Sequence, residues 1–245
     1  MPSGSKYDRT TSSSIDAVFS PAGREFEIPK FQRNYSWGDD KVEQLWSDFL
    51  ESFQDYLTNT DFKAAQYLLG PAVFVDVNNK FQVIDGQQRL ATLTILFCLA
   101  RDLIINIKKP GAGQTPDGLS ELIKVTENRR MDQHQNWKLI LNESDKGMLK
   151  EIQTYEKDVS SPDYKSPDEK IKDWADRIKN PATSDDFTDS MKKIIDAYKL
   201  LLCKMKNALY TGFESGDQVE EILERLKEDA KNTVTEKIKA NPEKF

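Results

Sequence analysis

One short segment constrains the fold of this chain more than any other. An apolar run from Phe81 to Ile84 meets Asp85-Gly86 and then continues as a helical pattern over residues 87–107. Apolar residues followed by Asp-Gly indicate a strand that ends in a tight turn. A helix start leaves backbone N–H groups unpaired and carries a partial positive charge, so the predicted strand–turn–helix can bind an anion.

The polar side chains of this turn allow two interpretations. A carboxylate, two amides and a guanidinium could grip a phosphate and orient a water molecule, and they belong to Asp85, Gln87, Gln88 and Arg89. A structural alternative also fits, because Asp85 and Gln88 have the spacing of a helix capping box. Arg89 lies four residues after Asp85 and could pair with it. This alternative leaves Gln87 without a role.

A second segment, residues 28–37, alternates aromatic and polar residues in a stretch predicted to be extended. In the functional interpretation, Gln32 and Arg33 are polar groups at the rim of a pocket with an aromatic wall, which suits a nucleobase and its phosphate. The structural alternative buries the aromatic side chains and leaves the arginine in solvent. These aromatic residues are Phe31, Tyr35 and Trp37.

The whole chain is predicted to have an α+β fold. We expect a disordered leader over residues 1–14, a small mixed sheet with helices over 15–110, and a mostly helical extension over 111–245. The pattern predicts a helix from Asp39, capped by Asp39 or Asp40. Strands are predicted at 66–77, 81–84 and 137–141, with an Asn-Asn turn after the first. Further helices are predicted at 119–130, 144–155, 168–178, 187–211 and 218–231.

Composition excludes several classes of function. The net charge of −6 gives no overall nucleic-acid signature, so any DNA contact needs a local basic patch. His134 is the only histidine, which excludes a histidine-rich metal site. Cys98 and Cys203 lie far apart in apolar helical patterns and are expected to be buried, without a disulfide. Neither a signal peptide nor a membrane span is predicted, so a cytoplasmic protein is expected.

Three ordered blocks together resemble one protein family. They are IPxFQRxYxW at residues 28–37, YLLG at 67–70 and VIDGQQRLxTL at 83–93. These blocks are similar to the N-terminal domain of GmrSD-type and SspE-type restriction proteins, also known as domain of unknown function 262. The resemblance covers residues 15–105 well, whereas the remainder matches in helical character only.

The resemblance implies a fold similar to ParB and sulfiredoxin. It further implies binding and hydrolysis of an NTP, GTP or ATP with Mg²⁺, in a system that restricts modified DNA in defence against phage. The catalytic residues carried over from the family motif are Asp85, Gln87, Gln88 and Arg89. Those carried over for nucleotide or phosphate binding are Gly86, Gln32, Arg33 and Tyr35.

Two departures from the family pattern shape the prediction. The usual partner is a His-Asn-His nuclease domain, which a chain with one histidine cannot contain. It is expected to be supplied by a separate polypeptide or to be missing from this sequence. A Phe-Glu-x-Leu-Asn-x-x-Gly block is also missing, which predicts a C-terminally truncated domain.

We therefore expect an NTP-hydrolysing regulatory domain of a restriction system. The alternative is a DNA- or protein-binding module of the same fold without turnover. A sulfiredoxin-like redox enzyme is disfavoured, because Cys98 lies about ten residues inside the predicted helix rather than at the turn.

Overall fold

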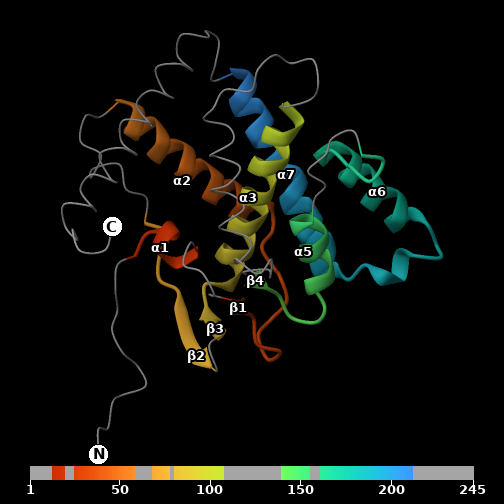
Figure 1. Ribbon diagram of the computed structural model, residues 1–245, viewed down its shortest axis with the longest axis horizontal. Helices are drawn as coiled ribbons and strands as arrows, with labels where there is room; N and C mark the ends of the chain where they lie inside the picture. Colours follow the sequence, from red (N-terminus) through yellow and green to blue (C-terminus); the bar gives the residue numbers. More distant parts are fainter. Residues whose placement is uncertain are drawn as a thin grey trace, which may run out of the picture.

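The computed structural model of the chain describes residues 13–19, 25–58, 68–77, 80–107, 139–154 and 161–211. Figure 1 shows the arrangement of its helices and strands. In chain order they are α1 (Ile15–Phe19), β1 (Phe26–Glu27), α2 (Asp39–Thr58), β2 (Val73–Val77), β3 (Lys80–Asp85), α3 (Gln87–Ile107), β4 (Leu139–Ile140), α5 (Lys146–Gln153), α6 (Pro167–Lys179), the 3₁₀ helix η1 (Ser184–Asp186) and α7 (Asp189–Thr211). A small sheet with packed helices confirms the predicted α+β class.

The four strands form one mixed sheet in the order β2-β3-β1-β4. β2 and β3 pair antiparallel, as predicted for the hairpin, while the Asn-Asn turn itself lies outside the described residues. β1 lies between β3 and β4 and runs parallel to both. Phe26 pairs with Phe81 on one side and with Leu139 on the other. This central place of β1 brings the segment that follows it beside the end of β3.

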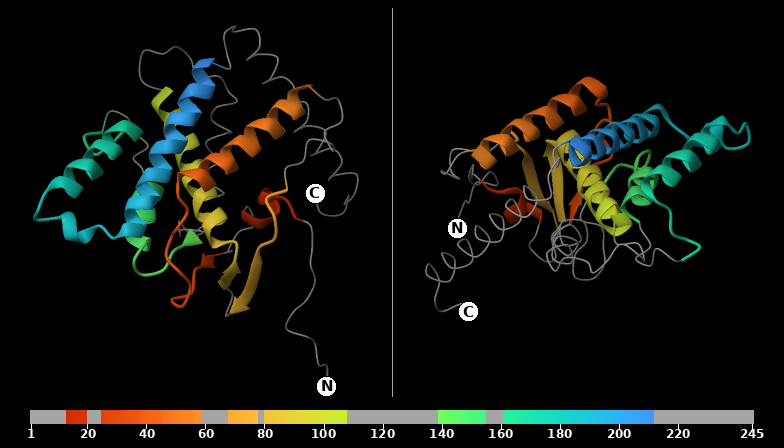
Figure 2. Two further views of the ribbon diagram at one scale, coloured as in Figure 1. Left: turned by 180° about the vertical axis from the view of Figure 1, so that it is seen from behind. Right: turned by 90° about the horizontal axis from the view of Figure 1, so that it is seen from above.

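α3 is the central helix of the fold. Most of its side chains between Leu90 and Leu103 are buried, as expected for a helix that is apolar on several faces. The helix contacts α5, α6, α7 and β4, and Figure 1 shows it above the strands. α2 packs in turn against α7, as both views in Figure 2 show. One hydrophobic cluster runs from Phe19 to Leu202, and the predicted boundary at residue 110 lies outside the described residues.

Helix α6 begins with a complete set of local signals. Ser166 and Glu169 form a capping box, and Pro167 occupies the first turn, where its missing N–H costs nothing. The helix joins α3 through a buried ion pair, in which Lys170 Nζ lies 3.0 Å from Asp102 Oδ2. Arg101, fully buried, also pairs with Asp102 and donates to the carbonyl of Gln153.

Most predicted elements are confirmed, with shifted ends. α2 begins at Asp39 and α3 spans residues 87–107, as expected. β2 begins only at Val73, not at residue 66, because Gly70 adopts a φ of +84° and Pro71 follows it. β3, β4, α5, α6 and α7 overlap their predicted ranges, whereas α1, β1 and η1 were not predicted. The helices predicted at 119–130 and 218–231 lie outside the described residues.

The two cysteines have different environments. Cys98 is buried in α3, as predicted, whereas Cys203 is exposed, so its predicted burial is wrong. Leu201 and Leu202 form the buried side of α7 at this level, and the next residue along the helix faces solvent.

Within the part of the chain that the structure describes, no helix is long and apolar enough to span a membrane.

Candidate functional site

The strand-to-helix turn depends on a glycine. β3 ends at Asp85, and the carbonyl of Gly86 accepts the first α-helical hydrogen bond of α3 from Leu90 N, at 3.0 Å. Gly86 has a φ of +89°, which side-chain-bearing residues rarely adopt. A Cβ at this position would lie 3.0 Å from the Cβ of Ala72. The backbone of Gly86 therefore passes close to the segment before β2, and only glycine fits there without strain.

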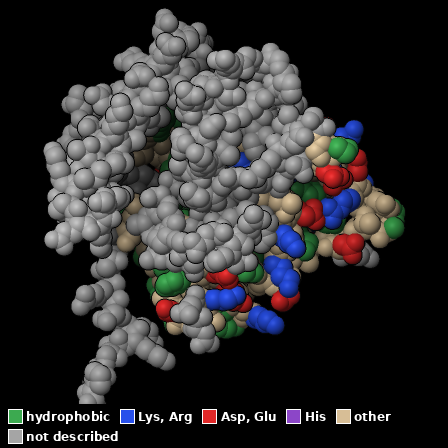
Figure 3. Space-filling view, viewed as in Figure 1, with side chains coloured by type: hydrophobic (Ala, Val, Ile, Leu, Met, Phe, Trp, Pro, Cys, Tyr) green, Lys and Arg blue, Asp and Glu red, His purple; other side chains and the backbone are tan. Residues whose placement is uncertain are grey.

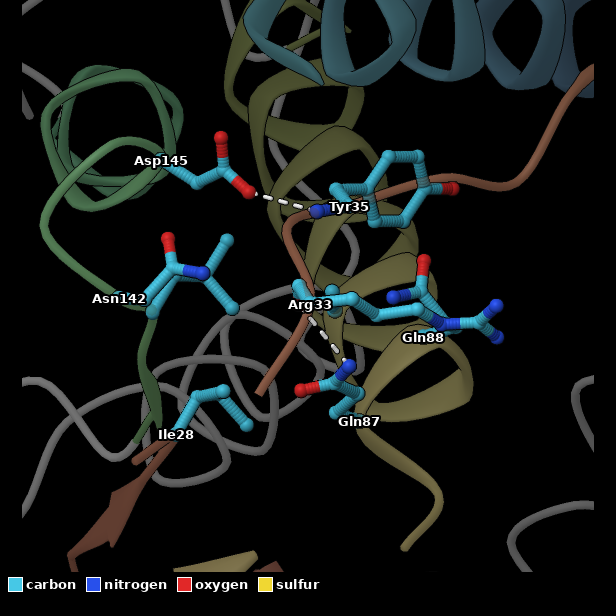
Figure 4. Close-up of a pocket in the computed structure, with 9 residues that line it drawn as sticks. Ile28, Arg33, Tyr35, Gln87, Gln88, Asn142 and Asp145 are labelled. Atoms are coloured by element: carbon cyan, nitrogen blue, oxygen red, sulfur yellow. Dashed lines mark hydrogen bonds between the residues drawn. The ribbon is translucent and has the colours of Figure 1, made fainter. Parts of the chain in front are cut away.

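The two glutamines that follow hold a distant loop. Gln87 Nε2 donates to the backbone carbonyl of Arg33 at 3.0 Å. Gln88 Nε2 donates to the carbonyl of Asn34 at 3.1 Å, while its Oε1 accepts from the N–H of Ser36 at 2.8 Å. Figure 4 shows the first of these bonds and the position of both glutamines beside the loop. The double amide, which the capping interpretation left partly unexplained, thus fixes residues 33–36.

The same loop has three further anchors. Gln32 Nε2 donates to the carbonyl of Ile84 at 3.0 Å, directly before the turn. The hydroxyl groups of Tyr35 and Thr92 lie 2.9 Å apart on the buried side of the loop. The backbone N–H of Tyr35 donates to Asp145 Oδ2 at 2.6 Å. The loop after β1 is therefore tied to β3, to α3 and to the turn before α5.

Arg89 holds a second loop on the other side of the turn. Its guanidinium donates to the backbone carbonyls of Leu69 and Pro71. Gly70 lies between them at a φ of +84°, and a Cβ there would collide with the same guanidinium. The three sequence blocks thus interlock: the DGQQR turn binds the block around residue 33 through its glutamines and the YLLG block through its arginine.

These contacts correct the two bonds that the structural alternative predicted for the turn. Asp85 and Gln88 form no capping box, because Gly86 occupies the N-cap position and moves the helix start by one residue. The predicted pair between Arg89 and Asp85 is also wrong, since the arginine donates to two backbone carbonyls instead.

Two predicted site residues have exposed charged side chains. Asp85 and Arg33 are both exposed. The bonds from Gln32 to Ile84 and from Gln87 to Arg33 lie on either side of Asp85 along the chain, so the loop runs beside this carboxylate. In Figure 4 the Arg33 side chain points away from Asn142 and Asp145.

The positions of Tyr35 and its aromatic neighbours match neither the predicted pocket wall nor the predicted burial of all three side chains. Tyr35 is only 4% exposed, and burial raises the pKa of its hydroxyl to about 12. Trp37 is half-buried, whereas Phe31 is 77% exposed, so the expected burial of Phe31 is wrong. Phe31 occupies the turn that leads into the loop, where the chain changes direction at the surface.

Sequence reasoning missed the residues that support the loop from the helical part. Asn142 Nδ2 donates to Asn34 Oδ1 at 2.7 Å, and Asp145 accepts from Tyr35 N and from Ser190 Oγ. Both Asn142 and Asp145 are buried. The available signal was a pair of short polar side chains directly after the predicted strand at 137–141, the position where parallel strands present functional groups.

The surroundings give no sign of a preassembled metal centre. Among the described residues, no group of three or more His, Cys, Asp or Glu side chains could hold a metal ion. On the face drawn in Figure 3, the coloured acidic and basic side chains are interspersed and form no patch of one sign.

The fold and this turn define an α+β domain in which one strand-to-helix motif fastens two loops. The family model for the GmrSD restriction endonuclease N-terminal domain matches residues 15–241. The chain therefore belongs to this family, as the three sequence blocks predicted, and it is a component of a restriction system. The match also includes the helical remainder, beyond the range of 15–105 expected from the sequence. No curated protein matches the chain significantly.

Proposed function

We propose that this domain binds a nucleoside triphosphate at the Asp85 turn and hydrolyses it as the regulatory part of a modification-dependent restriction system. One observation carries the proposal. The loop that bears the exposed Arg33 is fixed by Gln87 and Gln88 against the N-terminus of α3, beside the exposed Asp85. A cationic side chain and a helix N-terminus together favour a bound phosphate.

In this proposal Arg33 and the first-turn N–H groups of α3 bind and neutralise the phosphates. Gly86 contributes through its positive φ, which lets β3 turn directly into α3 and so places Asp85 beside the first turn of the helix. Gln32 keeps the start of the loop against Ile84. Asp85 orients the attacking water, as a carboxylate at a phosphoryl-transfer site can do.

Mg²⁺ fits this donor set. It usually keeps several waters and binds through one or two carboxylates together with the phosphates of the substrate, so a dedicated acidic cluster is not needed. Asp85 would hold the ion, which would neutralise charge on the phosphates when bound.

The structure changes the roles expected for the other motif residues. Gln88 uses both amide atoms, Gln87 uses its nitrogen, and Arg89 uses its guanidinium on backbone groups of the two loops. We therefore propose that these three side chains position the site, and that Tyr35 does so from the core. Gln87 retains one free oxygen.

Turnover coupled to DNA is proposed to control a nuclease. A His-Asn-His nuclease needs histidines that this chain does not contain, since His134 is the only one. We propose that a partner polypeptide supplies the nuclease, and that modified DNA is the signal. The interspersed charges of the face in Figure 3 favour a local rather than an extended DNA contact.

Phosphate release from GTP, ATP and CTP with Mg²⁺, with and without DNA, tests the proposal. Arg33→Ala removes the guanidinium but keeps the backbone carbonyl that Gln87 binds, so the loop stays anchored. Asp85→Asn removes the carboxylate charge. Both variants should lose about 10²-fold or more in turnover, the size expected for a lost charge-stabilising or proton-handling group.

Matched controls remove the same charges elsewhere. Asp76→Asn lies on the neighbouring strand β2, and Lys193→Ala lies on α7; both residues are exposed. Both controls should keep wild-type turnover. Equal rates in the wild type, Asp85→Asn and Arg33→Ala would refute the catalytic assignment.

One observation favours a second candidate, a binding module without turnover. Three of the four side chains expected to be catalytic are engaged with the backbone of this domain. This module would bind nucleotide or DNA in calorimetric titration, lose that binding in Arg33→Ala, and release no phosphate under any of the conditions above.

A further inference from the structure

A small cavity lies on the buried side of the Arg33 loop. It is enclosed mainly by the loop, the start of α3 and the turn between β4 and α5, and Figure 4 shows its lining. The volume open to water is about 10 Å³, which is close to what a single water-sized occupant needs. Its lining includes the side chains of Gln87, Asn142 and Asp145 among apolar ones.

Two side-chain oxygens at this cavity have no hydrogen-bond partner. They are Gln87 Oε1 and Asn142 Oδ1, which belong to residues only 8% and 7% exposed. Their orientation is fixed, because Gln87 Nε2 donates to the Arg33 carbonyl and Asn142 Nδ2 donates to Asn34 Oδ1. Asn142 Nδ2 also donates to the backbone carbonyl of Gln32 at 3.5 Å, so turning either amide would place its oxygen against a backbone carbonyl. The two oxygens are therefore left over by the network rather than misassigned.

A buried carboxylate completes the set. Asp145 is 1% exposed and lines the same cavity. It accepts one hydrogen bond on each oxygen, from Tyr35 N and from Ser190 Oγ, and no salt bridge to it is found among the described residues. Each carboxylate oxygen can accept more than one hydrogen bond, so lone pairs remain. A buried charge with no counter-ion is costly and calls for one.

We propose that this cavity binds one monovalent cation of the size of K⁺, held by Gln87 Oε1, Asn142 Oδ1 and the Asp145 carboxylate. Oxygen acceptors from three side chains that line the cavity are available and one of them is a carboxylate, whereas a water molecule has only two protons to donate. Ca²⁺ and Mg²⁺ prefer more carboxylates or a larger hydrated site than this cavity offers. An organic amine would need more space than one water-sized volume.

Such an ion joins three parts of the fold that lie far apart in the sequence. Gln87 belongs to α3, Asn142 and Asp145 to the turn before α5, and the loop bound by all three carries Arg33. The ion then stabilises the arrangement of the loop whether or not a nucleotide binds. The inference is independent of the proposed function, and its test uses no nucleotide.

Thermal unfolding in KCl and in choline chloride, at equal ionic strength, tests the site. Choline is too large for the cavity. At a K⁺ concentration about ten times the dissociation constant, binding multiplies the folding equilibrium constant by about 11. In a chain of this size Tm should then rise by roughly 3–6 °C in KCl. Equal Tm values for the wild type in the two salts would overturn the proposal.

Asp145→Asn removes the charge at the cavity with little change in shape and should abolish most of the K⁺-dependent rise. Asp189→Asn is the matched control, because it removes an exposed charge from the first turn of α7, next to Ser190, and should keep the full rise. A full rise in Asp145→Asn would place the ion elsewhere and overturn the proposal.

A second measurement decides the matter if Asp145→Asn does not fold. Crystals of the wild type soaked in RbCl should show an anomalous peak within coordination distance of Gln87 Oε1 and Asn142 Oδ1. A peak there supports the site. Density without an anomalous signal means that only water occupies the cavity, and it would overturn the proposal.

Discussion

Gln88 Oε1 accepts a hydrogen bond of 2.8 Å from the backbone N–H of Ser36, a residue 52 positions earlier in the chain. The other end of the same amide donates to the carbonyl of Asn34 at 3.1 Å. A side-chain amide that bonds to one N–H and one C=O of a single segment imitates a neighbouring strand. Gln88 therefore holds the loop in one register, with Arg33 on its exposed side.

Replacing Gln88 by alanine should destabilise the domain. Two hydrogen bonds to partly buried backbone groups are lost, at roughly 1 kcal/mol each, so the free energy of unfolding should fall by about 2 kcal/mol. Gln44→Ala is the matched control, because Gln44 is an exposed helical glutamine whose one side-chain bond among the described residues goes to Asp48, and it should change stability by less than about 0.5 kcal/mol. Urea unfolding measures both, and equal midpoints would contradict the anchoring role.

Replacing Gly86 by alanine should also destabilise the domain, for a backbone reason. Its φ of +89° is strained for alanine, and the added Cβ would lie 3.0 Å from the Cβ of Ala72. We expect a loss of about 1–3 kcal/mol. Gly147→Ala in α5 is the control, since nothing lies within 4 Å of its Cβ; it should gain about 0.5–1 kcal/mol. Opposite signs of the two shifts in thermal unfolding are the expected result.

The sequence predicts local elements at this site better than contacts across it. The strand, the turn and α3 follow from a continuous pattern of some twenty-five residues, and the structure confirms them. The capping box was wrong because the positive φ of Gly86 starts the helix one residue late, which a spacing rule cannot detect. Bonds from Gln88 to backbone groups leave no periodicity in the sequence, because any residue supplies an N–H and a C=O. Asp145 accepts from the backbone N–H of Tyr35 and was missed for the same reason, whereas Asn142 bonds to the side chain of Asn34, 108 positions earlier, a contact that no local pattern encodes.

The buried pair between Asp102 and Lys170 should be sensitive to the loss of one partner. Both side chains are at least nine-tenths buried, with Nζ and Oδ2 3.0 Å apart. Asp102→Ala leaves the ammonium group of Lys170 buried without its carboxylate and should cost about 3–5 kcal/mol. The exposed pair of Asp196 and Lys199, 3.2 Å apart, is the control, and Asp196→Ala should cost no more than about 1 kcal/mol.

A double variant separates charge from packing at this pair. Asp102→Leu combined with Lys170→Met removes the ammonium group that Asp102→Ala leaves unpaired. It should recover part of the lost stability but not all of it, because the buried Arg101 still lacks its carboxylate partner. Chemical unfolding of the single and double variants measures the difference. A double variant less stable than Asp102→Ala would contradict the expected role of the pair.

Alkaline pH should destabilise the domain through Tyr35. Burial raises the pKa of its hydroxyl from 10.0 to about 12, and the hydroxyl of Thr92 lies 2.9 Å away. Between these two pH values the unfolded chain loses the proton while the folded domain keeps it, so unfolding is favoured as pH rises. The free energy of unfolding should fall by up to about 3 kcal/mol over this window, at 1.36 kcal/mol for each unit. Burial raises the pKa of Tyr198 in the same direction. Unfolding of Tyr35→Phe between pH 9 and pH 12 should therefore show a shallower but still downward slope, and an unchanged slope would contradict the assignment.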